Sequence, residues 1–288
     1  MHRRTLIAAL AAASASSRLA AQPVTRLAFT AIPDQDETRL VERFSRVASY
    51  LEAILRLPVV YVPVKSYPAA VTAFTNDQVQ LAWFGGFTGV QARRAVPNSQ
   101  AIGQGIEDQA FTSYFIANAA TGLTRGDTLP AGIAGRSFTF GARASTSGRV
   151  MPEYYLRKQF GKPPAEIFPR VGFSGDHTRT LQLVQSGAFE VGAMDFSVYG
   201  LEEKAGRVDP AKVSVIWQTP PFPDYNWTVR GDVDGKFGAG FATRLQAALL
   251  GINDPAILAA FGRSGFVAAK NEDYAPVELV AKSTELLD

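Results

Sequence analysis

The stretch "SFTFGARASTSGRVMPEYYLRKQF", residues 137–160, joins a predicted strand to a predicted helix through a turn of small polar residues. The apolar run before Gly141 is typical of a strand, and helical spacing begins at Gly148. Three hydroxyl residues lie between them: Ser145, Thr146 and Ser147. Free N–H groups and a partial positive charge at a helix start bind anions, and hydroxyls add directional donors. A hydroxyl there can also simply cap the helix, so the turn predicts either a cap or an anion site.

The same alternation of strand and helix signals runs along most of the chain. A linker-like segment at 121–135, "TGLTRGDTLPAGIAG", interrupts it, and the pattern restarts afterwards. This predicts two α/β units with mostly parallel sheets. The last helices have no strands of their own to cover, so we expect them to pack on the first unit, with two chain crossings between the units. We therefore predict lobe 1 at 22–120 plus 219–288 and lobe 2 at 121–218.

The first 21 residues have the pattern of a secretory signal peptide. A basic start, "MHRR", precedes an alanine-rich apolar run too short to span a bilayer, and small residues place cleavage near Ala21. The Arg3-Arg4 pair leaves both general and twin-arginine export open. Removing Arg3, Arg4 and Arg18 from the 29 basic residues leaves 26, equal to the 26 acidic residues. A neutral mature chain without basic clusters predicts no nucleic-acid partner.

Missing residue types exclude several kinds of chemistry. The chain has no cysteine, and His177 is the single histidine left once His2 departs with the signal peptide. A Cys–His nucleophile and a typical zinc site therefore cannot be built. The sequence has no nucleophile elbow, Walker loop or strand-linked dinucleotide fingerprint. We expect neither a metal nor another cofactor, and an enzyme is unsupported although a Ser–His–Asp grouping remains possible.

Four further stretches lie at predicted strand ends, where ligands gather in open α/β sheets. "FSGDHTRT" resembles the first turn and places His177 at a helix start. His177 there is either a donor to an oxyanion or a partly exposed residue with no role in binding. "AWFGGFTG" ends a strand, and "TPPFPDYNW" is an irregular connection rich in proline. Burial of a strand end would also explain the first segment, and the preference of proline for turns would also explain the second. The candidate side chains are Tyr67 in "KSYPAAV", Trp83, Phe84, Asp224 and Tyr225.

With these residues in view, the chain resembles the periplasmic solute-binding proteins of phosphonate-type ABC transporters, a group that also takes phosphate and phosphite. The resemblance covers about 25–270 and is strongest to members described as selenate-binding. The segments that carry it are "FTAIPDQDETRL", "SYPAAVTAF", "QLAWFGGFTGVQAR", "SYFIANAATG", "FTFGARASTSGRVMPEYYLR", "VGFSGDHTRTLQLVQSG" and "PPFPDYNWTVR". It implies two lobes of the type II binding-protein kind, closing on a ligand. The ligand-binding positions that it implies are Tyr67, Ser145, Thr146, Ser147 and His177, with Trp83, Phe84 and Phe111 as cleft walls.

The resemblance also bears on ligand choice. Phosphonate binders carry a tyrosine where this chain has Phe111, and aminophosphonate binders place carboxylates where this chain has Ser197 and Tyr225. Asp195 and Asp224 lie one or two positions away. This disfavours an aminoalkyl phosphonate and favours a small tetrahedral oxyanion. A proton-free dianion such as selenate needs donors only, whereas phosphite and phosphate carry protons and accept a facing carboxylate. Which of Asp176, Asp195 and Asp224 faces the cleft therefore decides the ligand.

We accordingly predict a monomeric periplasmic receptor that closes on a selenate-like oxyanion and delivers it to an inner-membrane ABC permease and its ATPase. The alternative ligand is phosphite, phosphate or a simple alkylphosphonate. Two alternatives from other classes are a periplasmic hydrolase and a ligand-sensing subunit.

Overall fold

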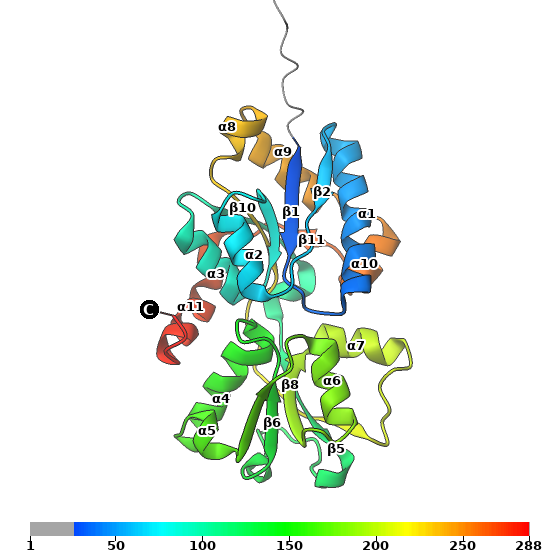
Figure 1. Ribbon diagram of the computed structural model, residues 1–288, viewed down its shortest axis with the longest axis vertical. Coiled ribbons are helices and arrows are strands. Elements are labelled where there is room, and N and C mark those ends of the chain that lie inside the picture. Colours follow the sequence, from blue (N-terminus) through cyan, green and yellow to red (C-terminus); the bar gives the residue numbers. More distant parts are fainter. Residues whose placement is uncertain (1–25, 288) are drawn as a thin grey trace, which may run out of the picture.

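The computed structural model describes residues 26–287, and these build two sheets stacked along the long axis of the molecule (Figure 1). The predicted signal peptide, 1–21, lies outside the described residues. The order of the first sheet is β11-β4-β10-β3-β1-β2, and that of the second is β7-β6-β8-β5-β9. Each sheet is covered by helices, which confirms the two-lobed α/β fold.

The first sheet forms the core of lobe 1. Its strands are β1 (Leu27–Ala31), β2 (Val59–Tyr61), β3 (Leu81–Phe84), β4 (Gln100–Gly105), β10 (Asn226–Val229) and β11 (Phe266–Val267). The helices beside it are α1 (Glu37–Leu55), α2 (Tyr67–Thr75), α3 (Gly86–Ala95), α8 (Val233–Phe237), α9 (Phe241–Leu250), α10 (Pro255–Phe261) and α11 (Ala275–Ser283), with the 3₁₀ turns η1 (Ile106–Ala110) and η5 (Asn271–Tyr274).

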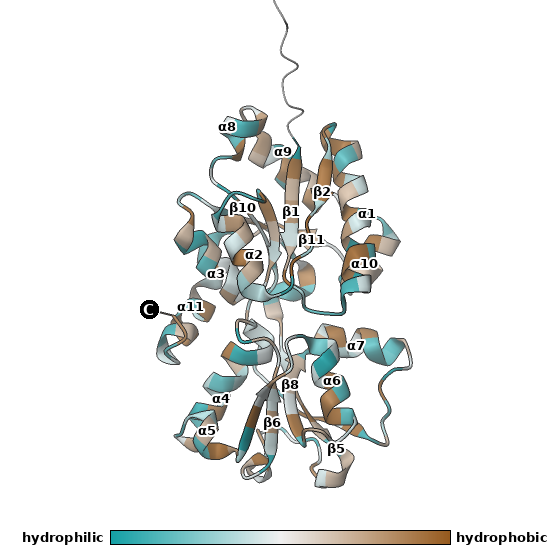
Figure 2. Cartoon of the chain, viewed as in Figure 1, coloured by the Kyte–Doolittle hydropathy of each residue, from teal (hydrophilic) through white to brown (hydrophobic). Residues whose placement is uncertain are grey.

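Helix α1 packs beside β2 of the first sheet. Asp36 caps it by accepting from the Arg39 amide. Its buried face includes Leu40, Phe44 and Leu51, spaced so that they lie on one side of the helix. In Figure 2, β1 and β2 are largely apolar, whereas α1 carries apolar and polar bands. Burial of one stripe against the sheet therefore accounts for this helix.

The second sheet has the same build. Its strands are β5 (Ser113–Asn118), β6 (Ser137–Phe140), β7 (Arg170–Phe173), β8 (Val191–Asp195) and β9 (Val213–Gln218). Around it lie α4 (Met151–Phe160), α5 (Pro164–Ile167), α6 (His177–Gln185), α7 (Phe196–Lys204), the 3₁₀ turns η2 (Ala119–Thr121) and η3 (Ala131–Ile133), and the π-turn η4 (Thr146–Val150).

Both sheets are mixed, whereas the sequence predicted mostly parallel sheets. Strands β5 and β10 run antiparallel to both of their neighbours. Each of these strands begins where the chain has just crossed between lobes, so it runs away from the crossing. The βαβ strands β3 and β8 end near the same place and therefore point the opposite way. The alternation pattern could not reveal this direction.

Two chain segments cross between the lobes side by side. Phe111 and Phe222 exchange two backbone hydrogen bonds of 2.8 and 2.9 Å, forming a short antiparallel bridge. Because β5 pairs within the second sheet, we place the first crossing at about residues 106–112 rather than at 120; the lobe ranges remain a proposal. Helices α9 and α10 pack on α1, as expected. Helix α11 differs, because its Val277 and Ala281 pack with both Phe87 of lobe 1 and Val150 of lobe 2.

Candidate binding site between the two lobes

Helix starts from both lobes meet between the two sheets. The Phe87 amide, in the first turn of α3, donates to Thr146 Oγ1 at 3.0 Å. The His177 amide, at the start of α6, donates to the carbonyl of Asp34 at 3.0 Å. These hydrogen bonds join segments that belong to different sheets. The turns that the sequence singled out at strand ends are therefore brought together in one place.

The turn at 145–148 caps a helix, which is one of the two roles that its sequence left open, and its role as an anion site stays a prediction. Ser145 caps the helix by accepting from the Gly148 amide at 2.9 Å, and its Oγ also lies 3.5 Å from His177 Nε2. The Val150 amide donates to the Ser145 carbonyl, which makes η4 a π-turn, a rare geometry that recurs at functional sites. The Ser147 hydroxyl is buried and has no hydrogen-bond partner among the described residues. It is therefore a donor available to a ligand.

His177 is completely buried, and its geometry identifies its tautomer. The Asp195 amide donates to Nδ1 at 3.2 Å, so Nδ1 carries no proton and the ring proton lies on Nε2. Nε2 faces Ser145, so the ring presents a donor toward the hydroxyl turn. A Cβ at Gly148 would lie 2.9 Å from His177 Cε1, which explains a glycine inside this helical turn. Turn and histidine are packed as one unit.

Lobe 1 contributes Tyr67 and the start of α3. Tyr67 is buried, and burial together with the nearby Asp34 carboxylate raises its pKa well above the usual value, while the adjacent Ser145 hydroxyl lowers it. No described residue meets its hydroxyl at full hydrogen-bond geometry. Gly85 precedes α3 and offers no side-chain cap, so the helix presents its amides to Asp224 and Thr146. Sequence reasoning missed these amides, although the glycine pair after a strand was a usable signal.

The three aspartates named from the sequence have different surroundings. Asp176 is half-buried and caps α6 by accepting from the Arg179 amide. Asp195 Oδ1 caps α7, and its Oδ2 accepts from the Tyr225 hydroxyl at 3.0 Å. Asp224 Oδ1 accepts from the Gly86 amide at 2.8 Å, but the buried Oδ2 has no partner at hydrogen-bond geometry within residues 26–287. Of the three, Asp224 is the one whose carboxylate keeps a free acceptor beside the donors.

Burial raises the pKa of Asp224 to about 7. The Gly86 amide and the adjacent Thr146 hydroxyl lower it, and the Asp195 and Asp108 carboxylates raise it again. Its carboxyl group therefore holds or shares a proton near neutral pH, which makes it able to face an anion without strong repulsion.

The aromatic candidates lie behind this layer. Trp83 stacks on Tyr225 with ring centroids 5.5 Å apart, and Phe111 contacts Tyr225 and Phe196. Phe84 packs against Phe74 in the core of lobe 1. Trp83 and Phe111 thus support Tyr225, and Phe84 supports α2.

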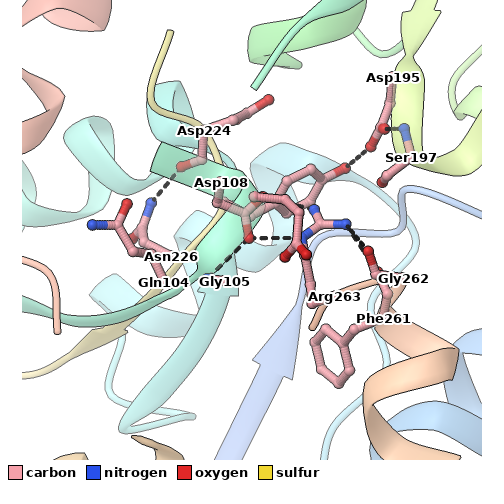
Figure 3. A network of polar contacts seen from close by, with 12 residues as sticks. Gln104, Gly105, Asp108, Asp195, Ser197, Asp224, Asn226, Phe261, Gly262 and Arg263 are labelled. Carbon is pink, nitrogen blue, oxygen red and sulfur yellow. Dashed lines mark hydrogen bonds and ion pairs between the residues drawn. The ribbon is translucent and has the colours of Figure 1, made fainter. Parts of the chain in front are cut away.

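A buried ion pair behind Tyr225 was not foreseen. Arg263 donates to Asp108 with Nε and Nη2 at 2.8 and 2.7 Å (Figure 3). Its guanidinium lies over the rings of Phe111 and Tyr225. The Asp108 carbonyl accepts from the Asp224 amide at 3.0 Å. No sequence pattern links two residues 155 positions apart. Buried Asp34, whose Oδ1 lies 3.8 Å from Arg43 Nη1, was also missed.

The chain matches a family model over residues 29–274, described as the periplasmic substrate-binding protein of phosphonate ABC transporters. The chain belongs to this family. It is a family of transporter binding proteins and not of enzymes, which rules against the hydrolase alternative. Among the described residues, no helix is long and apolar enough to cross a bilayer, and no cluster of three metal-ligating side chains occurs.

Relatives of known structure agree with the fold. The chain is 36% identical over 259 residues, 88% of its length and 87% of the relative's, to the probable ABC transporter phosphite-binding protein PhnD1 of Prochlorococcus marinus (strain MIT 9301). The structure of PhnD1 with methylphosphonate superimposes with a TM-score of 0.86, covering 91% of this chain and 98% of that one. A phosphonate-transporter binding protein from Pseudomonas aeruginosa, 19% identical, gives 0.76 with coverages of 90% and 86%.

Proposed function

We propose that this protein is the receptor of an ABC importer for phosphite and small alkylphosphonates such as methylphosphonate. The observation that carries the proposal is the unpaired, buried Oδ2 of Asp224 beside the hydroxyl turn. A phosphonate or phosphite monoanion offers both acceptor oxygens and one P–OH proton. It therefore matches a site that places an acceptor carboxylate beside several donors.

The proposed donors come from both lobes. They are the hydroxyls of Tyr67, Ser145, Thr146 and Ser147, and Nε2 of His177. All of these side chains are at most 2% exposed, so a ligand held by them is removed from water. Each hydrogen bond to a charged ligand contributes about 1.5–3 kcal/mol. Because neither lobe contains all of the proposed donors, both lobes must close on one anion to use them.

The ligand order predicted from the sequence changes. Selenate and sulfate carry no proton at neutral pH, so they can bind only where Asp224 is itself protonated, whereas a phosphonate or phosphite monoanion can donate to the ionised carboxylate. Neither the family nor the relatives described above support selenate. An aminoalkyl phosphonate is disfavoured for another reason, because Asp195 is already engaged by Tyr225 and by the α7 amides. The Prochlorococcus relative with methylphosphonate supports the simple alkylphosphonate alternative.

The test is calorimetric titration of the ligand-stripped mature protein at pH 7. The panel contains phosphite, methylphosphonate, phosphate, sulfate, selenate and 2-aminoethylphosphonate. We expect phosphite or methylphosphonate to bind at least about 100-fold more tightly than sulfate and selenate, a difference of about 2.7 kcal/mol. Equal or tighter binding of selenate would overturn the proposal, as would heat from none of the six ligands in a folded protein.

Its cellular setting follows from the family. We propose export to the periplasm with cleavage near Ala21, a monomeric state, and delivery to an inner-membrane permease with its ATPase rather than signalling. Amino-terminal sequencing of the exported protein tests the cleavage site. Ligand uptake that is lost when either the receptor or the permease is deleted tests transport against sensing.

A further inference from the structure

One ion pair joins the two lobes at their rim. Arg39, in the first turns of α1, donates through Nη1 to Glu202 Oε1, near the end of α7. Figure 1 shows the start of α1 facing α7 across the gap between the lobes. The Glu202 side chain is only 2% exposed, and that of Arg39 is 32% exposed. Neither residue belongs to the proposed ligand contacts.

Each partner also has a second partner within its own lobe. Arg39 Nε lies 2.9 Å from Asp36 Oδ2, one turn earlier on the same helix. Glu202 Oε2 accepts from Arg207 Nε at 2.6 Å, a residue of the same lobe. When the lobes separate, both charges therefore keep an ion pair, so opening leaves no buried charge unpaired. Closing adds the Arg39–Glu202 contact at a small desolvation cost.

The helices that carry this pair also begin at the proposed site. Helix α7 starts directly after Asp195, which accepts from Tyr225. Helix α1 starts three residues after Asp34, whose carbonyl accepts from the His177 amide. Because both helices are continuous elements, ligand contacts at one end and the ion pair further along favour the same closed arrangement of the lobes.

We infer that Arg39 and Glu202 form a latch that determines ligand affinity without touching the ligand. The inference rests on the proposed function only for the identity of the ligand. The apparent dissociation constant rises as the fraction of closed, binding-competent protein falls. Loss of the latch lowers that fraction and speeds ligand release, whereas the association rate changes little.

The test compares Arg39→Gln, Glu202→Gln and the double variant in calorimetric titrations with methylphosphonate. We expect each single variant to weaken binding about five- to twentyfold. The dissociation constant of the double variant should not exceed that of the single variant that binds more weakly. The matched control is Lys65→Gln, which breaks an exposed pair with Glu37 inside lobe 1. That change should alter affinity less than about twofold.

Closure of the lobes is measured in parallel by a method that needs no ligand. A failure of the latch proposal can then be told apart from a failure of the ligand proposal. The chain has no cysteine, so thiol-reactive dyes attach only at the two cysteines introduced by Lys162→Cys in lobe 2 and Asn253→Cys in lobe 1. Energy transfer in the unliganded protein should show a smaller closed population in Arg39→Gln than in Lys65→Gln. An unchanged closed population and an unchanged dissociation constant would overturn the latch. If no ligand of the panel binds the parent protein, the energy-transfer comparison of the unliganded variants still tests the latch.

Discussion

At the scale of single residues, Asp224 distinguishes this site from a simple anion pocket. Its Oδ1 accepts from the Gly86 amide, its buried Oδ2 has no hydrogen-bond partner among the described residues, and the carboxyl group adjoins the Thr146 hydroxyl. In its ionised form this carboxylate accepts a hydrogen bond from a ligand P–OH group and repels a ligand that has only acceptors. We therefore assign much of the proposed selectivity to this carboxyl group.

Replacing this carboxyl by an amide should change the ligand preference. In Asp224→Asn, the carbonyl oxygen can keep the Gly86 contact, and the NH₂ group then donates toward the ligand. We expect methylphosphonate and phosphite to bind about tenfold more weakly or worse, with sulfate and selenate binding more tightly, as measured by titration. Asp176→Asn, which alters a cap outside the donor cluster, serves as the control. A parallel loss for every ligand would contradict the acceptor role.

The same substitution should alter the pH dependence of stability. The pKa of Asp224 is about 7 in the folded chain and near 3.8 when unfolded, so between these values the folded protein binds more protons than the unfolded one. The free energy of unfolding therefore falls with rising pH through this window because of Asp224. Relative to the parent protein, Asp224→Asn should become progressively more stable from pH 4 to pH 7 in denaturant titrations. A pH-independent difference would argue against a buried, proton-holding carboxyl group.

At the scale of elements, the proposed anion contacts come from helix starts and not from basic side chains. The first turns of α3, η4 and α6 all lie at strand ends, and their amides, hydroxyls and histidine point into one region. The π-turn includes Thr146 and Ser147 and is capped by Ser145, and all three residues are buried. Dipoles and donors thus replace a lysine or arginine in the proposed contact layer.

The close packing of this turn on His177 makes Gly148 critical. A methyl group in Gly148→Ala would approach His177 Cε1 at 2.9 Å and Ser145 Oγ at 3.0 Å, so the ring and the hydroxyl must shift. We expect at least about tenfold weaker methylphosphonate binding and a destabilisation of about 1–3 kcal/mol, from titration and urea unfolding. Gly200→Ala in α7, where nothing lies within 4 Å, is the matched control and should be neutral or slightly stabilising. Normal affinity in Gly148→Ala would show that the ring position is unimportant.

At the scale of the whole molecule, the lobes are joined by more than the two crossing segments. The Phe111–Phe222 bridge connects the crossings to each other, and Arg263 with Asp108 braces them from lobe 1. Helix α11 adds apolar contacts to both lobes. Phe111 and the Arg263 guanidinium both pack on Tyr225, which follows Asp224 in the chain, so the crossings adjoin the proposed binding site.

The buried Arg263–Asp108 pair provides a test of this bracing. Arg263→Gln leaves the Asp108 carboxylate buried with a weaker partner, which should destabilise the protein by about 3–5 kcal/mol in urea unfolding. In the double variant Arg263→Met with Asp108→Leu, the buried charge is removed, and stability should recover at least partly. If the double variant is as unstable as the single one, the pair's role is packing and not charge balance.

Much of this molecule is readable from its sequence, because local patterns carry the relevant physics. Alternating strand and helix signals predicted the two α/β lobes, and the hydroxyl turn, the lone His177 and Tyr67 were singled out by residue type and position. Their burial and mutual approach fit that expectation. Strand direction was not predictable in the same way, since hydrophobic patterns are the same for parallel and antiparallel strands that are buried on both faces.

The sequence by itself determined the family, the two-lobed architecture and the segments that meet at the strand ends, since these depend on order along the chain. Only the tertiary structure decided which aspartate keeps a free oxygen, which histidine nitrogen carries the proton, and which charges pair across the lobes. Asp224, Asp195 and Asp176 are chemically identical in sequence. They differ in burial and in the donors that distant segments bring to them, and those arise only when the chain has folded.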